Sequence, residues 1–405
     1  MNNLSDLIFS FQYLVPPSVL DQHKLIKTDY KNFDYRLDKS RGDSSSSIQL
    51  LLNEISAATD RTIRQSTKSP LLLLSSGKDS IGLALGLAEA GFSVDTFSLV
   101  SDPEEKAFIE DVARCLGHKP SFVFTQDIVN QLDSLSECLP SNSRICLDQA
   151  LVFMHAALRL HGVGDDTLLI DGMGNDIYFG HLPSVDQTRS YRLYQFFLGR
   201  PPSVLDFYAR NFLQANGMST VTGKLIAPSI ERFNQRAGDL FKFDSPVFNL
   251  QEFVSRRAYV RGLFIDEGVY SEKTRILGDI FGADVVFPWS DSELSDYCFN
   301  LPQQSRFNLK SFRNKVLLRD LLFDRLDYDL PKRGIDAYEY ISEEVLISML
   351  INASIPDSFI AKISKNVAVN HVVKKRAYFE CFIFTCYLNA MGISDFESIF
   401  LNGLC

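Results

Sequence analysis

The residues best suited to chemistry lie in a short polar turn, residues 75–80, which follows the apolar run 70–74. A buried strand that leads into a helix start leaves free backbone N–H groups, and the positive end of the helix dipole points at the same place. Such a turn is a site for a phosphate-sized anion. Asp79 is unusual there, because a carboxylate repels phosphates unless a divalent cation lies between them. The turn therefore predicts a nucleotide bound together with Mg²⁺.

A second polar segment follows the apolar residues 167–170. Gly172 and Gly174 allow the backbone to turn sharply and to approach a ligand closely, and Asp176 opens the next segment. Either segment alone could be a turn with ordinary helix caps. Together they predict that Asp79 and Asp176 share a magnesium ion bound to nucleotide phosphates.

The elements that must position these residues alternate along the chain. Apolar spacing predicts helices at 48–66, 80–90, 103–116 and 147–160, and strands at 71–74, 94–100, 121–124 and 167–171. This order predicts an α/β fold with a parallel sheet and helices on both faces, whose ligands lie beyond the carboxyl ends of the strands. Beyond about residue 183 the pattern is mostly helical and rich in Phe and Tyr.

Composition narrows the function classes. The 405 residues carry a formal net charge of -9, which argues against nucleic acid as the main ligand. The apolar stretch 7–15 is too short for a membrane span and has no basic flank. The seven cysteines show no CxxC pair or metal-ligand spacing, so reduced thiols and a cytoplasmic location are expected.

Residues 75–80 are not a P-loop, because Asp79 follows Lys78 where that motif requires Ser or Thr. They resemble the pyrophosphatase loop (SGGxDS) of the N-type ATP pyrophosphatases, with Ser76 in the place of the first glycine. Residues 171–181 resemble the SGEGADELFGG segment of the asparagine synthetase synthase domain. The matching positions there are Gly172, Gly174, Asp176, Phe179 and Gly180.

Weaker likenesses extend over nearly the whole chain from about residue 10. Residues 287–291 and 301–302 resemble the VPFLD and LP segments of that family, 315–319 its TKxLLR segment and 331–335 its PKxGF segment. Residues 11–16 resemble the linker that joins the glutaminase and synthase domains. The expected organisation is a lead-in at 1–46 and one synthase-like domain at 47–405, with a nucleotide-binding core at 47–182 and a helical substrate part at 183–405.

The resemblance implies a five-stranded Rossmann-like sheet of the adenine nucleotide α-hydrolase type, with ATP and Mg²⁺ as cofactors. It implies adenylation of a small-molecule or peptide carboxylate with release of pyrophosphate, followed by attack of an amine to give an amide and AMP. The residues implied to bind the nucleotide are Ser75, Ser76, Gly77, Lys78, Asp79, Ser80, Gly172, Met173 and Gly174, with Phe97, Ser98 and Leu99 contacting adenine through their backbone. Lys315 and Lys332 are the implied catalytic lysines, although either could be a solvated surface charge.

Two departures from the family limit this expectation. The chain begins Met1-Asn2-Asn3 and so lacks the nucleophilic cysteine of a glutaminase at position 2. The amine is therefore expected from ammonia, from a partner protein or from the substrate itself. Met173 stands where the family has a glutamate or a tyrosine, and a thioether cannot take a proton from an amine.

Other residues are candidates for the missing roles. Asp148 and His181 are possible bases, although Asp148 could be a helix cap and His181 a loop residue. Arg256 and Arg257 are carboxylate-binding candidates on charge alone.

The sequence thus predicts a stand-alone, AMP-forming, amide-forming ligase of a specialised pathway such as natural-product synthesis, peptide modification or surface-sugar amidation. One alternative is another reaction of the same superfamily, such as tRNA thiolation. The negative net charge of the chain and the missing CxxC pair disfavour it. Another is a nucleotide-binding or scaffold protein that has lost catalysis, for which Met173 is the main support.

Overall fold

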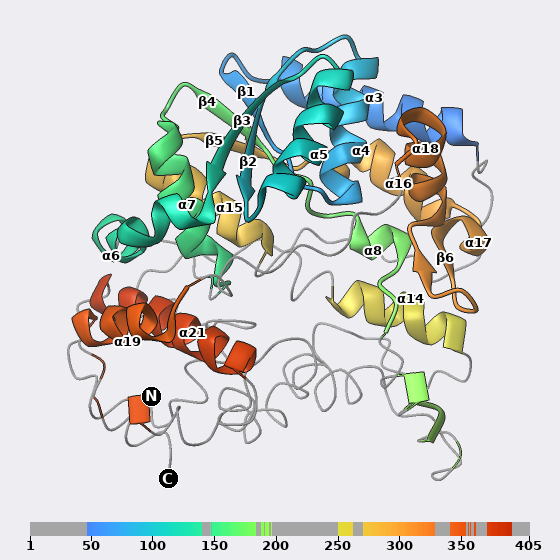
Figure 1. Ribbon diagram of the computed structural model, residues 1–405. Coiled ribbons are helices and arrows are strands. Elements are labelled where there is room, and N and C mark those ends of the chain that lie inside the picture. The colour runs from blue at the N-terminus through green and yellow to red at the C-terminus, as the bar shows by residue number, and fades with distance from the viewer. Residues whose placement is uncertain are drawn as a thin grey trace, which may run out of the picture.

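A parallel five-stranded sheet of order β3-β2-β1-β4-β5 forms the centre of the computed structural model (Figure 1). The structure describes residues 47–139, 146, 148–183, 188–189, 191–193, 196, 250–261, 270–328, 341–353, 355, 357, 360–361 and 371–390. The strands are β1 Ser69–Leu73, β2 Asp95–Val100, β3 Lys119–Phe124, β4 Thr167–Ile170 and β5 Asp284–Val286. The predicted α/β fold class is confirmed. The fifth strand lies at 284–286, in the part of the chain where the sequence indicated helices.

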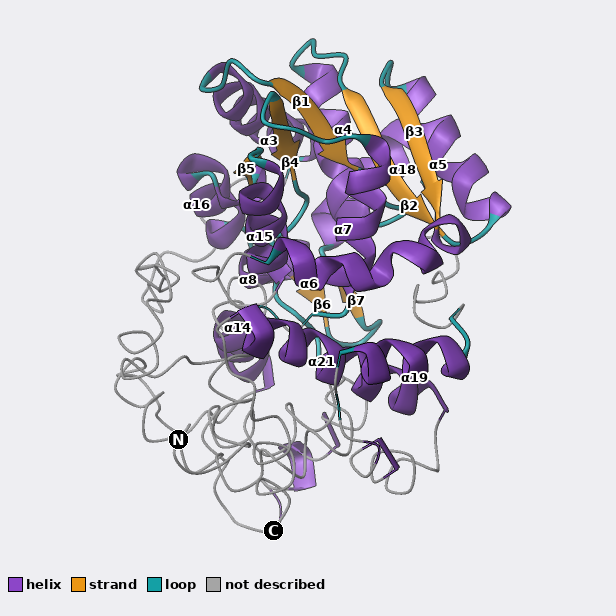
Figure 2. Ribbon diagram, turned by 90° about the vertical axis from the view of Figure 1, so that its left-hand side faces the viewer, coloured by secondary structure: helices purple, strands orange, loops and turns teal. Residues whose placement is uncertain are grey.

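Helices cover both faces of the sheet, as Figures 1 and 2 show. The predicted helices appear as α3 Ile48–Arg64, α4 Lys78–Glu89, α5 Pro103–Cys115 and α7 Ala150–His161, and α15 Glu272–Phe281 precedes β5. The crossovers through α4 and α5 lie on one face, with α3 packed on α4, whereas α7 and α15 lie on the other.

Shorter and later elements surround this centre. They are η1 Thr125–Ser134, α6 Leu135–Cys138, α8 Asp176–Phe179, α14 Leu250–Arg261, η5 Pro288–Ser290, α16 Ser292–Asn300, α17 Gln303–Arg306, the antiparallel pair β6 Phe307–Asn308 and β7 Arg313–Asn314, α18 Val316–Leu326, α19 Glu343–Asn352 and α21 His371–Ala390. Helix α18 packs on α3 and α4. Within these ranges no helix is long and apolar enough to cross a membrane.

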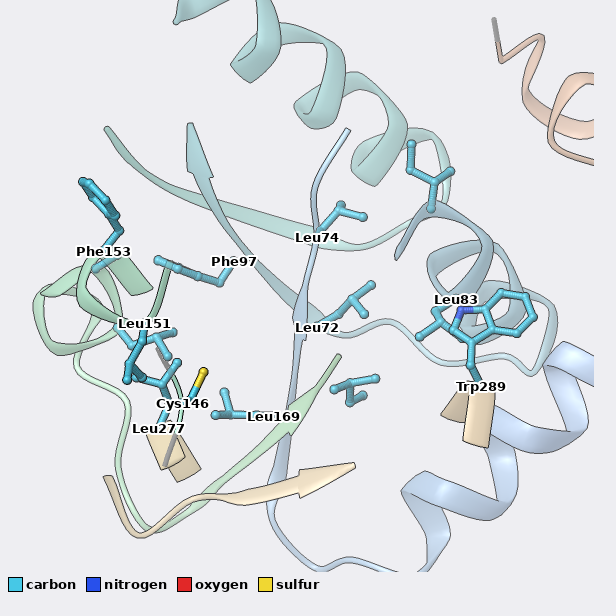
Figure 3. Packing of buried hydrophobic residues seen from close by; sticks show 14 of the residues in the cluster. Leu72, Leu74, Leu83, Phe97, Cys146, Leu151, Phe153, Leu169, Leu277 and Trp289 are labelled. Atoms are coloured by element: carbon cyan, nitrogen blue, oxygen red, sulfur yellow. The ribbon is translucent and has the colours of Figure 1, made fainter. Parts of the chain in front are cut away.

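The core explains why the run of leucines in β1 is continuous and does not alternate with polar residues. Leu71 and Leu72, whose side chains point to opposite faces of the sheet, are 6% and 0% exposed, because a central parallel strand is covered by helices on both faces. In Figure 3, Phe97 of β2 and Phe153 of α7 approach each other on one side of β1, while Trp289 lies near Leu83 of α4 on the other side. The core therefore fixes the ends of β1 and β2, from which the site is built.

The strand order places the two predicted loops next to each other. The chain leaves β1 for β2 on one side, and β4 pairs with β1 on the other side, with Leu72 opposite Ile170. The carboxyl ends of β1 and β4 thus flank the point where the strand order reverses, which is where ligands bind in sheets of this kind. Residues 75–80 and 171–176 both emerge at this point.

Candidate functional site

The turn after β1 is held in shape by its own serines. The Ser80 hydroxyl accepts a hydrogen bond from the Ser75 N–H at 3.1 Å and lies 2.9 Å from the Ser75 hydroxyl. It also lies 3.1 Å from the carbonyl oxygens of Ser75 and of Gly77, either of which can accept a hydrogen bond from it. The Gly77 N–H donates to the Ser75 hydroxyl at 3.2 Å. In this structure Ser80 organises the turn from a buried position, and Ser75, at the exposed end, remains accessible.

Helix α4 begins within this turn, at Lys78, with Gly77 as its N-cap. The first backbone bond of the helix runs from Ile81 N–H to the Gly77 carbonyl. No acceptor for the N–H groups of Lys78 and Asp79 occurs among the described residues. These two N–H groups, at the positive end of a 12-residue helix, suit an anion.

Two further residues support the turn, and the sequence did not single out either. The Ser76 hydroxyl donates to Glu105 at 3.2 Å, and the Tyr328 hydroxyl donates to the Ser76 carbonyl at 2.7 Å. Glu105 stands in the first turn of α5, directly after β2. Its position after a strand of the same sheet was the one available signal, since elements that follow parallel strands meet at one edge.

The loop after β4 passes so close to α4 that its glycines are required. A Cβ atom on Gly172 would lie 2.9 Å from the Ser80 nitrogen and 3.0 Å from the Ser80 Cα. Gly174 has a φ of 109°, which other residues rarely adopt. The Asp171 carboxylate accepts hydrogen bonds from the Met173 N–H, at 3.1 Å, and from the Thr274 hydroxyl. The second loop is therefore packed directly on the helix start that presents Asp79.

The polar centre of the site is Lys315, which is 1% exposed. Its Nζ lies 2.6 Å from Asp79 Oδ2, 2.6 Å from Asp176 Oδ1 and 2.5 Å from Asn175 Oδ1. The Asn175 amide also donates to Asp79 Oδ1 at 3.0 Å. The structure thus joins both predicted metal ligands and one predicted catalytic lysine. The alternative of a solvated surface lysine is wrong for Lys315, because its ammonium is buried between these groups.

Asn175 is the member of this centre that the sequence did not predict. It is 1% exposed and lies between Gly174 and Asp176, so its place inside the second loop was the available signal. Trp289 of η5 also reaches the centre: its indole N–H donates to the Asp79 carbonyl at 3.1 Å. This contact places the predicted segment 287–291 beside the loops.

Among the described residues around this centre, cations outnumber carboxylates. Burial lowers the pKa of Lys315, but the carboxylates of Asp176 and Asp79 outweigh it and raise the pKa above its ordinary value. Burial and the neighbouring Lys315 lower the pKa of Lys78, which also interacts with both carboxylates. Arg319 lies near Asp79, and burial lowers its pKa. Among the described residues, three cationic side chains therefore lie near two carboxylates, a balance that suits an anionic ligand.

The same oxygen atoms suit a magnesium ion that arrives with other ligands. Carboxylate and amide oxygens are the donors that Mg²⁺ prefers, and nucleotide sites use only one or two protein carboxylates. In the part of the chain that the structure describes, no group of three His, Cys, Asp or Glu side chains converges on a metal position. Asp79 and Asp176 would therefore need oxygen ligands from elsewhere.

A cavity of about 330 Å³ opens beside the turn, a volume at the lower end of the range of small-molecule sites. Its walls come from the ends of β1, β2 and β4 and from α7 and α15. The lining residues are Leu73, Leu74, Ser75, Phe97, Leu99, Gln149, Ala150, Phe153, Met154, Asp171, Met173, Lys273 and Thr274. Most of the wall is apolar, with polar groups concentrated near Ser75 and Lys273.

The end of β2 offers backbone groups to this cavity. The pairing of β1 with β2 ends at the bond from Leu74 N–H to the Phe97 carbonyl, although β2 continues to Val100. Alternate residues of a parallel strand direct their backbone groups to the same neighbour, so the N–H and carbonyl of Leu99 face the side of β1 beyond the last pair. Ser98 does not line the cavity and has a buried hydroxyl with no partner among the described residues.

Met173 and Lys273 both line the cavity. Lys273 lies 3.3 Å from Asp148 Oδ2, and the other oxygen of Asp148 accepts the Ala150 N–H at the start of α7. Asp148, one of the two candidate bases, therefore serves as a helix cap and as the partner of a lysine. The sequence did not single out Lys273, because a Lys in the first turn of an amphipathic helix is usually a surface residue.

The remaining candidates lie apart from the cavity. Arg257 NH1 lies 2.9 Å from His181 Nδ1 and 2.9 Å from the His181 carbonyl, so Arg257 holds the other candidate base. Neither residue lines the cavity. The side chain of Arg256 and the whole of Lys332 lie outside the described residues.

No protein-family model matches the chain, and the search of curated proteins finds no similar protein.

Proposed function

We propose that this protein is an ATP- and magnesium-dependent ligase that adenylates a substrate carboxylate and transfers the acyl group to an amine. The observation that carries the proposal is the convergence of Asp79 and Asp176 on one Lys315 nitrogen, at the reversal point of the sheet and beside a cavity. Structural ion pairs are common, but this one lies where the two loops predicted to bind a nucleotide meet.

The geometry supports each half of an ATP site. The N–H groups of Lys78 and Asp79, which have no acceptor among the described residues, and the nearby cationic side chains suit the triphosphate. The apolar cavity next to Ser75 suits the adenosine part, with the backbone of Leu99 available to the edge of the base. Asp79 and Asp176 would hold a magnesium ion, which neutralises phosphate charge when bound.

In the proposed reaction, a carboxylate oxygen of the substrate attacks the α-phosphorus and pyrophosphate leaves. The amine nitrogen then attacks the acyl carbon, loses a proton, and AMP leaves. The residues of this chain contribute alignment and charge. The turn at 75–80 holds the departing pyrophosphate. Lys315, which lies beside Asp79 and Asp176, places a positive charge near the phosphates. Holding the adenylate and the amine together can contribute about 7–11 kcal/mol to the rate.

ATP–pyrophosphate exchange, screened over candidate carboxylates, tests this proposal. Asp79→Asn and Asp176→Asn are expected to abolish exchange, because each removes one of the two charges that hold the cation. Asp284→Asn is the matched control. Asp284 is an exposed carboxylate that pairs with Lys68, and it lies at the amino end of β5, away from the carboxyl ends of the strands where the site is. Full exchange in either site variant would refute the assignment.

Met173 favours a second candidate, a nucleotide-binding protein that does not complete amide formation. Met173 lines the cavity, and its thioether cannot accept a proton; Asp148, which precedes the lining residue Gln149, is already paired with Lys273. This candidate predicts ATP binding, measured by calorimetry, without AMP formation in the presence of carboxylate and amine. A cytoplasmic location and a substrate from a specialised pathway belong to the main proposal; cell fractionation tests the location, and finding the carboxylate that supports exchange tests the substrate.

A further inference from the structure

Lys315 already occupies the position of a cation between the two aspartates. An ammonium group has three N–H donors, and here all three have oxygen acceptors, on Asp79, Asn175 and Asp176. The three distances lie between 2.5 and 2.6 Å. The ammonium is thus held by a complete set of oxygen ligands, as a metal ion would be.

The backbone keeps Lys315 in this place. Its φ of 53° is in the left-handed region, which a residue with a long side chain adopts only where the surroundings hold it. Its carbonyl accepts the Arg319 N–H at 2.9 Å, so the residue is tied to the start of α18. Helix α18 in turn packs on α3 and α4. The lysine is therefore part of the folded core and does not lie in a loose surface arm.

The charge balance opposes a second cation. Of the charged groups that the structure describes at this centre, Lys78, Lys315 and Arg319 together carry one more charge than Asp79 and Asp176. A free divalent ion would have to displace the ammonium and enter a region that is already positive. A polyphosphate would reverse that balance and would give the ammonium other oxygen atoms to bind.

From this geometry we propose that Lys315 excludes free divalent cations from Asp79 and Asp176, so that the site accepts magnesium only together with a nucleotide polyphosphate. The inference rests on the proposed function for the identity of the ligand. It adds that Lys315 determines the form in which the ligand is bound: the metal–nucleotide complex, and not the free ion. Lys315 acts here as a positioning residue, which is separate from any role during the reaction.

Binding of Mn²⁺, followed by its electron paramagnetic resonance signal, tests the exclusion. The wild-type chain is expected to bind no Mn²⁺ alone and about one Mn²⁺ in the presence of α,β-methylene-ATP, which cannot be cleaved to AMP. Lys315→Met is expected to bind Mn²⁺ without nucleotide at least about 100-fold more tightly than the wild type, because the competing charge is gone. Mn²⁺ alone should also raise the melting temperature of this variant and leave that of the wild type unchanged.

Two further variants locate the effect. Lys68→Met removes a lysine that forms an exposed ion pair with Asp284, and it should gain no Mn²⁺ binding. Adding Asp79→Asn to Lys315→Met should abolish the gained binding, because one of the two carboxylates is then neutral.

Wild-type protein that binds Mn²⁺ alone as tightly as it does with α,β-methylene-ATP would overturn the inference, and this measurement does not depend on whether Lys315→Met folds. ATP–pyrophosphate exchange could still be found in that case, so the proposed function would survive. A chain that binds no Mn²⁺ even with the nucleotide analogue would refute the proposed function, whereas Mn²⁺ binding gained by Lys315→Met would still support the exclusion by the lysine.

Discussion

Replacing Gly172 with alanine tests whether the two loops must touch for the site to work. The added Cβ would lie 2.9 Å from the Ser80 nitrogen and 3.0 Å from its Cα, whereas ordinary contacts begin at 3.4 Å. Both neighbours are backbone atoms of α4, so no side chain can rotate away. The second loop must therefore move from the helix start by about 0.5 Å, and Asp176 moves with it.

The size of the effect follows from this displacement. Overpacking a tight contact costs about 1–3 kcal/mol of stability. A misplacement of about 1 Å in a catalytic site costs about 100-fold in rate, so half of that should lower ATP–pyrophosphate exchange about tenfold. The loss should exceed what the fall in stability explains, because the folded fraction stays close to one at 25 °C.

Exchange rates and urea unfolding of the same preparations measure the two effects. Gly164→Ala is the matched control, because the nearest atom to its added Cβ is 3.7 Å away and it lies in the turn before the same strand. Unchanged exchange in Gly172→Ala, with a stability equal to that of Gly164→Ala, would refute the view that the contact between the loops sets the geometry of the site.

Two other predictions concern stability and the cavity. His155 is 0% exposed, and burial lowers its pKa from 6.5 to about 4, so the unfolded chain binds its proton first and stability is lost as the pH falls below 6.5. Between pH 7 and pH 5 this residue should lower the free energy of unfolding by about 2 kcal/mol. The variant His155→Phe can still stack on Phe281, and its urea midpoint should fall less over that range than the midpoint of the wild type. An equal fall in both proteins would contradict the assignment. Met154→Trp should fill the cavity and weaken ATP binding, measured by calorimetry, at least about tenfold. Leu160→Trp is the control, because Leu160 lies on the same helix but is 49% exposed, and it should leave the affinity unchanged. Equal affinities of the two variants would show that ATP lies elsewhere.

Those parts of the fold that depend on the local spacing of apolar residues could be predicted from the sequence. Strands β1 to β4 and helices α3, α4, α5 and α7 were predicted because their apolar spacing extends over several residues. The meeting of Asp79 with Asp176 was predicted because parallel strands place their carboxyl ends at one edge. Whether these residues bind ATP and magnesium remains a prediction.

Other parts of the site depend on tertiary contacts that no local pattern records. Strand β5 has three residues, which is too short for alternation to be recognised, and it forms only because β4 offers a free edge. Lys315 precedes an amphipathic helix, where a lysine is usually solvated, and its partners lie more than 100 residues earlier in the chain. Lys273 was missed for the same reason, since its burial against Asp148 is a property of how α15 packs on α7.

The position of Trp289 has a practical consequence for work on this protein. It is the single tryptophan of the chain, it is 0% exposed, and its indole N–H is bonded to the carbonyl of Asp79. All tryptophan fluorescence of the molecule therefore originates at the backbone of the turn that begins α4. A shift of that turn changes the bond to the indole, so intrinsic emission follows the state of the turn without any label. The protein carries its own optical reporter at the point where its chemistry is proposed to begin.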